Sequence, residues 1–313
     1  MVAIAYNVRG LCVRAELETQ KLNMETQFNN STNVEDSTSA RLTQNPCYVQ
    51  CGLELNKIYN ESNLDTMKRM PDNFVDLTVT SPPYDGLRTY NGYSFPFEEI
   101  AQELYRVTKQ GGVLVWVVSD ATTNGTESGT SFRQALYFKE CGFNLHDTMI
   151  YHKHSPPLTH NRYEQHFEYM FILSKGKPKT FNPILEKKTW EDNRTQKAIR
   201  REKDGSSDIG YAGKSENKIK GNVWKYNVGG GHVTDDKIAY KHPAIFPEQL
   251  CADHIFSWSN ETDIVYDCFG GSGTTAKMAH LMKRNWILSE ISSEYVQIAE
   301  KRIATYLAQT SLF

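Results

Sequence analysis

Residues 264–275 read Ile-Val-Tyr-Asp-Cys-Phe-Gly-Gly-Ser-Gly-Thr-Thr, and this stretch decides the fold. Strand-forming residues end at Asp267, a glycine-rich turn follows, and the pattern predicts a helix over residues 272–283. In such a unit the main-chain N–H groups come close to a bound ligand. The chain of 313 residues leaves only 38 after position 275, whereas one parallel β-α-β unit needs roughly 30. The other strands of the sheet must therefore come from earlier in the chain.

The rest of the chain alternates between strand-like and helix-like patterns. The apolar run at residues 113–118 is typical of a central parallel strand. The alternation predicts an α/β fold with a mostly parallel sheet and an antiparallel strand at its edge. The expected strands are residues 53–59, 74–80, 113–118, 143–152, 167–173, 264–267 and 286–289, and the expected helices are residues 63–70, 97–109, 131–141, 247–258, 272–283 and 292 onward.

The composition is that of an ordinary soluble globular protein, with 39% hydrophobic and 23% charged residues. The sequence lacks a run of ~18 apolar residues, so we expect no membrane span. Its first residues also lack the apolar core of a signal peptide. The six cysteines have no paired zinc-like spacing, which predicts reduced thiols, no metal site and a cytoplasmic protein.

Two segments differ from the rest. Residues 1–46 are polar and poor in aromatic side chains, which predicts a flexible N-terminal arm, and Met24 within it is an alternative start. Residues 175–241 hold sixteen Lys or Arg and nine Asp or Glu, a balance of +7 in a chain of net charge −2. This asymmetry predicts either a basic surface for nucleic acid or a solvated, partly mobile insertion. The expected domains are the arm (1–46), a catalytic half (47–174), the insertion (175–240) and a cofactor-binding half (241–313).

The glycine turn fits the G-x-G-x-x-A pattern from Gly271 to Ala276, which is a weak signal alone. A P-loop is excluded, because no Gly-Lys-Ser/Thr follows at the required spacing. Glu290 ends the next strand, and an acid there can accept hydrogen bonds from ribose hydroxyls. The pattern predicts an adenosine-containing cofactor whose apolar face is covered by Phe269. The alternative is a turn that only packs a helix on a strand.

A second turn, Ser81-Pro82-Pro83-Tyr84, directly follows the predicted strand 74–80. The prolines rigidify it, the Ser81 hydroxyl and Pro82 carbonyl are acceptors, and Tyr84 offers a flat face. Such a turn suits the exocyclic amine of a stacked base, because two acceptors would aim the nitrogen lone pair at an electrophile. Residues 155–158 repeat Ser-Pro-Pro without an aromatic and without a clear strand before them, so we expect ordinary loop structure there. Strands of one parallel sheet end at one edge, so both turns should face the same crevice.

Thr80-Ser81-Pro82-Pro83-Tyr84 and Asp267-Cys-Phe-Gly-Gly-Ser-Gly together resemble the motifs of the S-adenosylmethionine-dependent DNA amino-methyltransferases. The motif order, with the catalytic motif first and the cofactor motif last, resembles the permuted beta group of that family over most of the chain. The resemblance implies a Rossmann-like, seven-stranded, mostly parallel methyltransferase sheet with the insertion as target-recognition region. It implies an S-adenosylmethionine site that includes Asp267, Phe269, Gly271, Gly273, Thr274 and Glu290, with His242 and Pro243 at the methionine end.

One position departs from the family pattern. The family often has Gly-Asp before its first helix, where the acid contacts adenine, and this chain has Glu61-Ser62-Asn63 there. The adenine contact therefore stays open. Family members with Ser-Pro-Pro-Tyr mostly resemble cytosine-N4 enzymes, and those with Asp-Pro-Pro-Tyr mostly adenine-N6 enzymes. We therefore expect Ser81, Pro82, Pro83 and Tyr84 to be the catalytic residues of a site-specific cytosine-N4 DNA methyltransferase, with adenine-N6 as the alternative.

Double-stranded DNA is the partner that this reading implies. The target base must be flipped out of the duplex, and Arg200, Arg201 and Lys203 are expected to bind DNA through phosphate contacts. The enzyme could belong to a restriction-modification pair with a cognate endonuclease. Two other classes compete: an NAD-dependent oxidoreductase, which leaves the Ser81 turn unexplained, and a non-catalytic DNA-binding module, which leaves both intact turns unexplained.

Overall fold

The computed structural model describes residues 52–83, 95–153, 163–188, 197–201, 204–211, 216–229, 231 and 233–310. The chain divides into two units, Met1–Cys47 and Tyr48–Phe313, and all described residues belong to the second. The predicted arm, Met24 and the Ser155-Pro156-Pro157 turn lie outside the described residues. Cys141, Cys251 and Cys268, the described cysteines, are free thiols. No helix in the described ranges combines the length and apolarity that a bilayer crossing needs.

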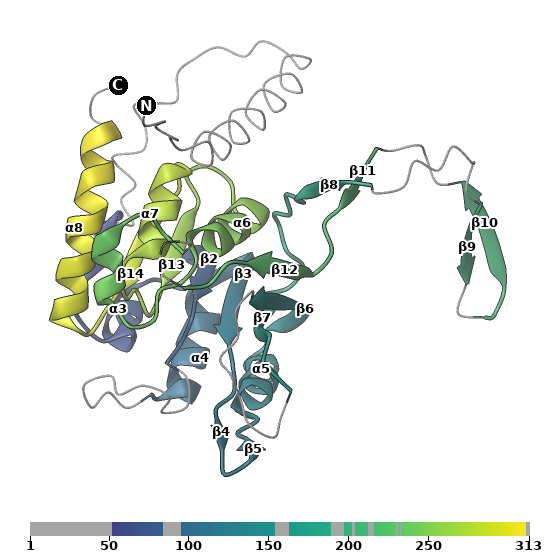
Figure 1. Ribbon diagram of the computed structural model, residues 1–313, viewed down its shortest axis with the longest axis horizontal. Helices are drawn as coiled ribbons and strands as arrows, with labels where there is room; N and C mark the ends of the chain where they lie inside the picture. Colours follow the sequence, from purple (N-terminus) through teal and green to yellow (C-terminus); the bar gives the residue numbers. More distant parts are fainter. Residues whose placement is uncertain are drawn as a thin grey trace, which may run out of the picture. The chain divides into compact units, whose positions relative to one another are not determined.

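An eight-stranded mixed sheet forms the centre of the second unit (Figure 1). All neighbouring strands run parallel except at β7, which is antiparallel to both of its neighbours. In spatial order the strands are β1 (Lys57–Tyr59), β14 (Asn285–Ser289), β13 (Ile264–Asp267), β2 (Val75–Thr80), β3 (Thr108–Val118), β7 (Phe167–Ser174), β6 (Asn144–Lys153) and β12 (Val223–Tyr226).

Two details of the predicted sheet were wrong. The sheet has eight strands rather than seven, because β12, from the predicted insertion, pairs with β6 in parallel. The antiparallel strand β7 lies inside the sheet between β3 and β6 rather than at an edge. The insertion expected over residues 175–240 therefore returns to the main sheet before its predicted end. The predicted α/β class and the mostly parallel sheet are confirmed.

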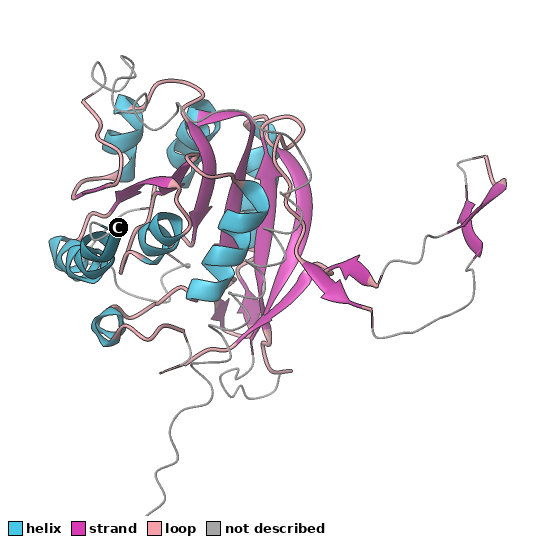
Figure 2. Ribbon diagram, turned by 90° about the horizontal axis from the view of Figure 1, so that it is seen from above, coloured by secondary structure: helices cyan, strands magenta, loops and turns pink. Residues whose placement is uncertain are grey.

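Helices cover both faces of the sheet (Figure 2). Alternate residues of β3 point to opposite faces: Leu114 and Trp116 pack with α3 (Asn63–Arg69), α4 (Phe97–Val107) and α5 (Thr130–Glu140). Val113 and Val115 face the other side, where the core includes residues of α6 (Glu248–Trp258), α7 (Thr274–Leu281) and α8 (Ser293–Thr310). The strands are buried on both faces, which explains their nearly continuous apolar sequences.

Three small ribbons and one short helix complete the described chain. They are β4 (Thr122–Thr123) with β5 (Thr126–Glu127), β8 (Leu185–Lys187) with β11 (Asn217–Ile219), β9 (Lys197–Arg201) with β10 (Ser207–Tyr211), and the 3-10 helix η1 (Lys237–Lys241).

The strands that carry the two predicted turns are direct neighbours. β13 and β2 pair in parallel through Val265↔Leu77 and Tyr266↔Thr78. The chain leaves β2 for α4 on one face and leaves β13 for α7 on the other face. The boundary between these strands is therefore a topological switch point, where open α/β sheets form a crevice for ligands.

Candidate active site

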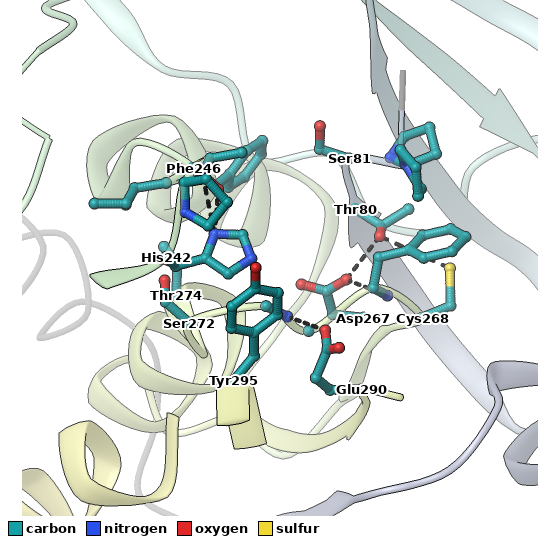
Figure 3. A pocket seen from close by; sticks show the side chains of 18 of the residues that line it. Thr80, Ser81, His242, Phe246, Asp267, Cys268, Ser272, Thr274, Glu290 and Tyr295 are labelled. Carbon is teal, nitrogen blue, oxygen red and sulfur yellow. Dashed lines mark hydrogen bonds between the residues drawn. The ribbon is translucent and has the colours of Figure 1, made fainter. Parts of the chain in front are cut away.

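A cavity of ≈ 1660 Å³ lies at this switch point (Figure 3). The glycine turn and the Ser-Pro-Pro turn both line it, as predicted from their strand ends. The predicted site residues that line the cavity are Ser81, Pro82, Pro83, His242, Pro243, Asp267, Phe269, Gly271, Thr274 and Glu290. Tyr84 and Lys203 lie outside the described residues, and for Arg200 and Arg201 in β9 the description covers the backbone only.

Asp267 joins the two strand ends. Its Oδ1 accepts hydrogen bonds from Thr80 Oγ1 at 2.6 Å and from the Phe269 N–H at 3.0 Å, and its Oδ2 accepts one from Thr275 Oγ1 at 2.6 Å. Burial raises the pKa of Asp267, and these three donors oppose that shift. Both carboxylate oxygens are thus used inside the protein. Asp267 holds the end of β2 against the glycine turn, so it fixes the spacing between the two turns.

Glu290 organises the opposite side of the glycine turn. Its Oε2 accepts a hydrogen bond from the Gly271 N–H at 2.8 Å, and its Oε1 accepts one from the Ser292 N–H at 2.8 Å. Burial raises the pKa of Glu290, the backbone donors lower it, and the nearby Asp267 charge raises it further. The Glu290 carboxylate thus contacts the turn and also lines the cavity, so it is placed to accept a hydrogen bond from a ligand hydroxyl.

Gly271 and Gly273 have different roles. Gly271 lines the cavity at φ +49°, and a Cβ there would lie 3.1 Å from His242 Nε2. Gly273 is the N-cap of α7 at φ +79°, and a Cβ there would lie 2.9 Å from Ala299 Cβ in α8. Gly273 is not among the lining residues, and its contact with the cofactor stays a prediction. Its lack of a side chain lets α8 pack against the turn.

His242 and Tyr295 form the wall beside Gly271 (Figure 3). Their rings meet edge to face with centroids 4.3 Å apart. His242 Nδ1 lies 2.9 Å from the Ala244 carbonyl oxygen and 3.2 Å from the Ala244 nitrogen. These contacts orient the imidazole so that its Nε2 edge is toward the glycine turn. The sequence pattern did not identify Tyr295 as a residue of the cavity.

Asn63 stands where the family pattern has an acid. Its side chain is buried, lines the cavity and donates through Nδ2 to the Cys268 carbonyl at 3.1 Å. Its Oδ1 is a buried acceptor without a hydrogen-bond partner among the described residues. Such an acceptor is costly unless a ligand or water satisfies it. Phe269 nearby packs edge to face on Phe95 at 5.7 Å, which leaves an apolar surface beside a polar acceptor.

The far wall of the cavity was not predicted from the sequence. It is formed where β6 ends and β7 begins, and its residues include Tyr151, Lys153, Gln165 and Glu168. Lys153 and Glu168 form an ion pair with side chains only 21% and 12% exposed. Burial raises the pKa of Tyr151, and the neighbouring Glu168 charge adds to the shift. The sequence could have indicated that these residues lie at one edge of the sheet. Their place in the cavity also depends on the order of the strands, which the sequence does not show.

A buried cluster of four charges supports the glycine turn from behind. Arg302 donates to the Ser272 carbonyl at 3.0 Å and to Thr274 Oγ1 at 2.9 Å. Its guanidinium also donates to Asp236 Oδ2 at 2.7 Å and Glu248 Oε1 at 2.5 Å. Lys277 donates to the same two oxygens at 2.8 and 2.6 Å. The cluster (Asp236, Glu248, Lys277 and Arg302) thus ties the end of the insertion to α6, α7, α8 and the turn.

The cavity therefore combines an apolar surface, an unsatisfied amide oxygen and a carboxylate at one end with the Ser-Pro-Pro turn at the other. The first set fits an adenosine-containing cofactor: a base against Phe269, a polar contact at Asn63 and ribose hydroxyls at Glu290. Within the described segments, no group of three or more His, Cys, Asp or Glu side chains is placed to hold a metal ion.

Comparisons with known proteins agree with this arrangement. A family profile described as DNA methylase matches residues 75–301. Orphan methyltransferase M.BamHII of Bacillus amyloliquefaciens is 58% identical over 238 residues, which cover 74% of this chain and 90% of that protein. Type II methyltransferase M.BglII of Bacillus subtilis is 28% identical over 256 residues, with coverage of 78% and 68%. The solved PvuII DNA methyltransferase (cytosine-N4-specific) has a TM-score of 0.58 at 21% identity, covering 78% of this chain and 84% of its own, and so shares the fold.

Proposed function

This chain belongs to the family of N6- and N4-specific DNA methylases, and we propose that it transfers a methyl group from S-adenosylmethionine to the exocyclic N4 of a flipped cytosine. The observation that carries this proposal is the meeting of Ser81-Pro82-Pro83 and the glycine turn in one cavity. The competing oxidoreductase would use the glycine turn alone and would leave a Ser-Pro-Pro turn in the same cavity without a role.

The cofactor would occupy the side of the cavity formed by α8 and the glycine turn. When bound, S-adenosylmethionine supplies an electrophilic methyl group. Glu290 is placed to accept hydrogen bonds from the ribose, and Asn63 Oδ1 to accept one from the adenine amine in place of the family's acid. Phe269 would cover the adenine face, while His242 and Pro243 would line the methionine end.

The residues of the Ser-Pro-Pro turn would position the target amine. Ser81 Oγ and the Pro82 carbonyl oxygen would accept its two N–H bonds and direct the nitrogen lone pair at the methyl carbon. The cofactor would supply the methyl group and leave as a neutral thioether, and the amine would release one proton through these acceptors to water. Tyr84 would stack on the base and offset part of the cost of flipping, which is a few kcal/mol.

Cytosine is proposed over adenine because Ser81 stands where adenine-N6 enzymes of this family mostly have Asp. The proposal is tested by incubating unmethylated plasmid DNA with labelled S-adenosylmethionine, digesting the DNA and identifying the modified nucleoside. We expect N4-methylcytosine. N6-methyladenine would refute the choice of base and keep the reaction class, whereas no labelled nucleoside would count against the enzyme as a methyltransferase.

Ser81→Ala tests the catalytic residue. We expect a loss of turnover of about 10- to 100-fold, the range for one oriented hydrogen bond to a group that develops charge, with S-adenosylmethionine affinity unchanged. Ser155→Ala is the matched control, because it removes the serine of the second Ser-Pro-Pro sequence. Equal turnover in the two variants would remove Ser81 from the site.

The DNA would lie along the insertion, with Arg200, Arg201 and Lys203 among its phosphate contacts. A thermal shift with S-adenosylmethionine and with NAD separates the enzyme classes, since stabilisation by NAD alone would support an oxidoreductase. A restriction-modification pair would include a cognate endonuclease. The similarity to a relative named an orphan methyltransferase favours instead an enzyme that acts without one.

A further inference from the structure

We propose that Lys153, held by Glu168, reads the N3 and O2 edge of the flipped base, and so provides the cytosine-binding side of the cavity. This inference rests on the proposed function and adds the residues that would recognise the substrate base. It starts from the far wall, where an ion pair faces the same cavity as the Ser-Pro-Pro turn.

The strand register places this ion pair beyond the same edge of the sheet as the catalytic turn. Thr80 in β2 is in register with Trp116 in β3, which is in register with Phe171 in β7. Glu168 precedes Phe171 by three residues along the antiparallel strand β7, so it lies about 10 Å beyond this row. The Ser81-Pro82-Pro83 turn leaves β2 after Thr80 in the same direction, and both line the cavity.

The lateral spacing suits one base. Lys153 ends β6, which is three strands away from β2, or about 14 Å at a strand spacing of about 4.8 Å. Two hydrogen bonds of about 3 Å each leave about 8 Å, which the Ser81 and Lys153 side chains share with one ring. A base whose amine is held at Ser81 would therefore present its opposite edge to Lys153.

The far-wall side chains share one face of the sheet. Tyr151 and Met170 belong to the core on the α6 side, and alternation places Lys153 and Glu168 on that face as well. Tyr151 and Glu168 are direct partners in the antiparallel register. Backbone pairing of Lys153 with His166, at 2.7 Å, fixes the end of β6. The ammonium group thus comes from a fixed strand end rather than from a loop.

The chemistry of this pair matches cytosine better than adenine. Next to its amine, cytosine presents two adjacent acceptors, N3 and O2, whereas adenine presents N1 followed by a C–H group. An ammonium group has three donors, so it can contact Glu168 and still serve both acceptors. Because Glu168 balances the charge of Lys153, the pair adds little net positive charge beside a ring whose amine becomes positive during methyl transfer.

A purely structural ion pair is the competing explanation, and the same sheet offers a matched example. Lys109 and Asp76 form an ion pair at 2.6 Å near the opposite, amino-terminal edge of the sheet, away from the cavity lining. If the far-wall pair only supports the sheet, Lys153→Met and Lys109→Met should affect the enzyme similarly. If Lys153 contacts the base, the two variants should differ in DNA turnover.

The experiment measures single-turnover methyl transfer to DNA, S-adenosylmethionine affinity and thermal unfolding for the full-length protein. Once the wild-type site has been mapped by sequencing, a second duplex carries 3-deazacytosine, which lacks the N3 acceptor, at the target position. We expect Lys153→Met to slow transfer about 10- to 100-fold, the range for a hydrogen bond to a charged group, with cofactor affinity unchanged. Lys109→Met should keep the wild-type transfer rate, and Lys153→Arg should recover part of it.

The base analogue gives the decisive comparison. We expect the wild type to lose transfer on 3-deazacytosine, and Lys153→Met to lose nothing further on it. Equal wild-type rates on both duplexes would overturn the proposed contact, even if Lys153→Met failed to fold. A wild-type protein that forms no methylated cytosine would instead overturn the proposed function, so the two failures are distinguishable.

Discussion

Arg302→Met tests the buried four-charge cluster behind the glycine turn. The Arg302 side chain is 0% exposed, and those of Asp236 and Glu248 are 17% and 20% exposed. In the wild type two acids face two bases, so the substitution leaves two acids paired with one base, Lys277. Removing one partner from a buried ion pair costs about 3–5 kcal/mol, because a buried charge is left uncompensated.

Chemical denaturation and calorimetry measure this effect. We expect the free energy of unfolding to fall by about 3–5 kcal/mol and the melting temperature by roughly 6–20 °C for a domain of this size. Affinity for S-adenosylmethionine should fall as well, because Arg302 also donates to Ser272 and Thr274 of the turn. Lys68→Met is the control: it removes an exposed ion pair with Asp65 and should cost less than about 1 kcal/mol. Equal stability of the two variants would refute the argument.

Two further predictions concern backbone space and pH. Gly273→Ala should lower the free energy of unfolding by about 1–2 kcal/mol through its positive φ and by about 1–3 kcal/mol more through the contact with Ala299. Gly129→Ala is the control, because Gly129 has φ +64° and nothing within 4 Å, so it should show only the first loss in thermal unfolding. Equal losses in the two variants would contradict the packing role of Gly273. Burial favours a higher pKa for Asp236, but hydrogen bonds from Lys277, Tyr306 and Arg302 outweigh it and hold the pKa at about 2, below its ordinary 3.8. This stabilisation is therefore present above pH 3.8 and lost toward pH 2, about 2 kcal/mol in all, so denaturation between pH 4 and pH 2 should be steeper for the wild type than for Asp236→Asn.

The pairing of the two turns could be predicted from the sequence because each follows a strand. Asp267 ends one apolar run and Thr80 ends another, and strands of a parallel sheet end at a common edge. Their direct hydrogen bond could not be predicted, since it depends on β13 and β2 being neighbours. The same limit applies to Lys153 and Glu168, whose place in the cavity follows from strand order alone.

The eighth strand was missed because β12 has only four residues in a polar, basic segment. Its pattern was available: Trp224 and Tyr226 are buried while Val223 and Lys225 are exposed, the period of a half-buried strand. The interior position of β7 had no sequence signal, because an apolar strand reads alike in either direction. The roles of Asp236 and Arg302 depend on an ion pair between residues 66 positions apart.

The return of the insertion to the main sheet has an evolutionary consequence. Near the start of the insertion Asn182 donates to the carbonyls of Phe256 and Ser259, and further along it Asn222 donates to the Thr148 carbonyl. Between these two asparagines β8 pairs with β11. The outgoing and returning parts of the chain therefore lie one strand spacing apart, about 4.8 Å. A segment attached through two adjacent points can be exchanged by recombination without refolding its host. If the insertion recognises DNA as proposed, exchange of this segment would change the sequence preference and leave the residues of the cavity unchanged.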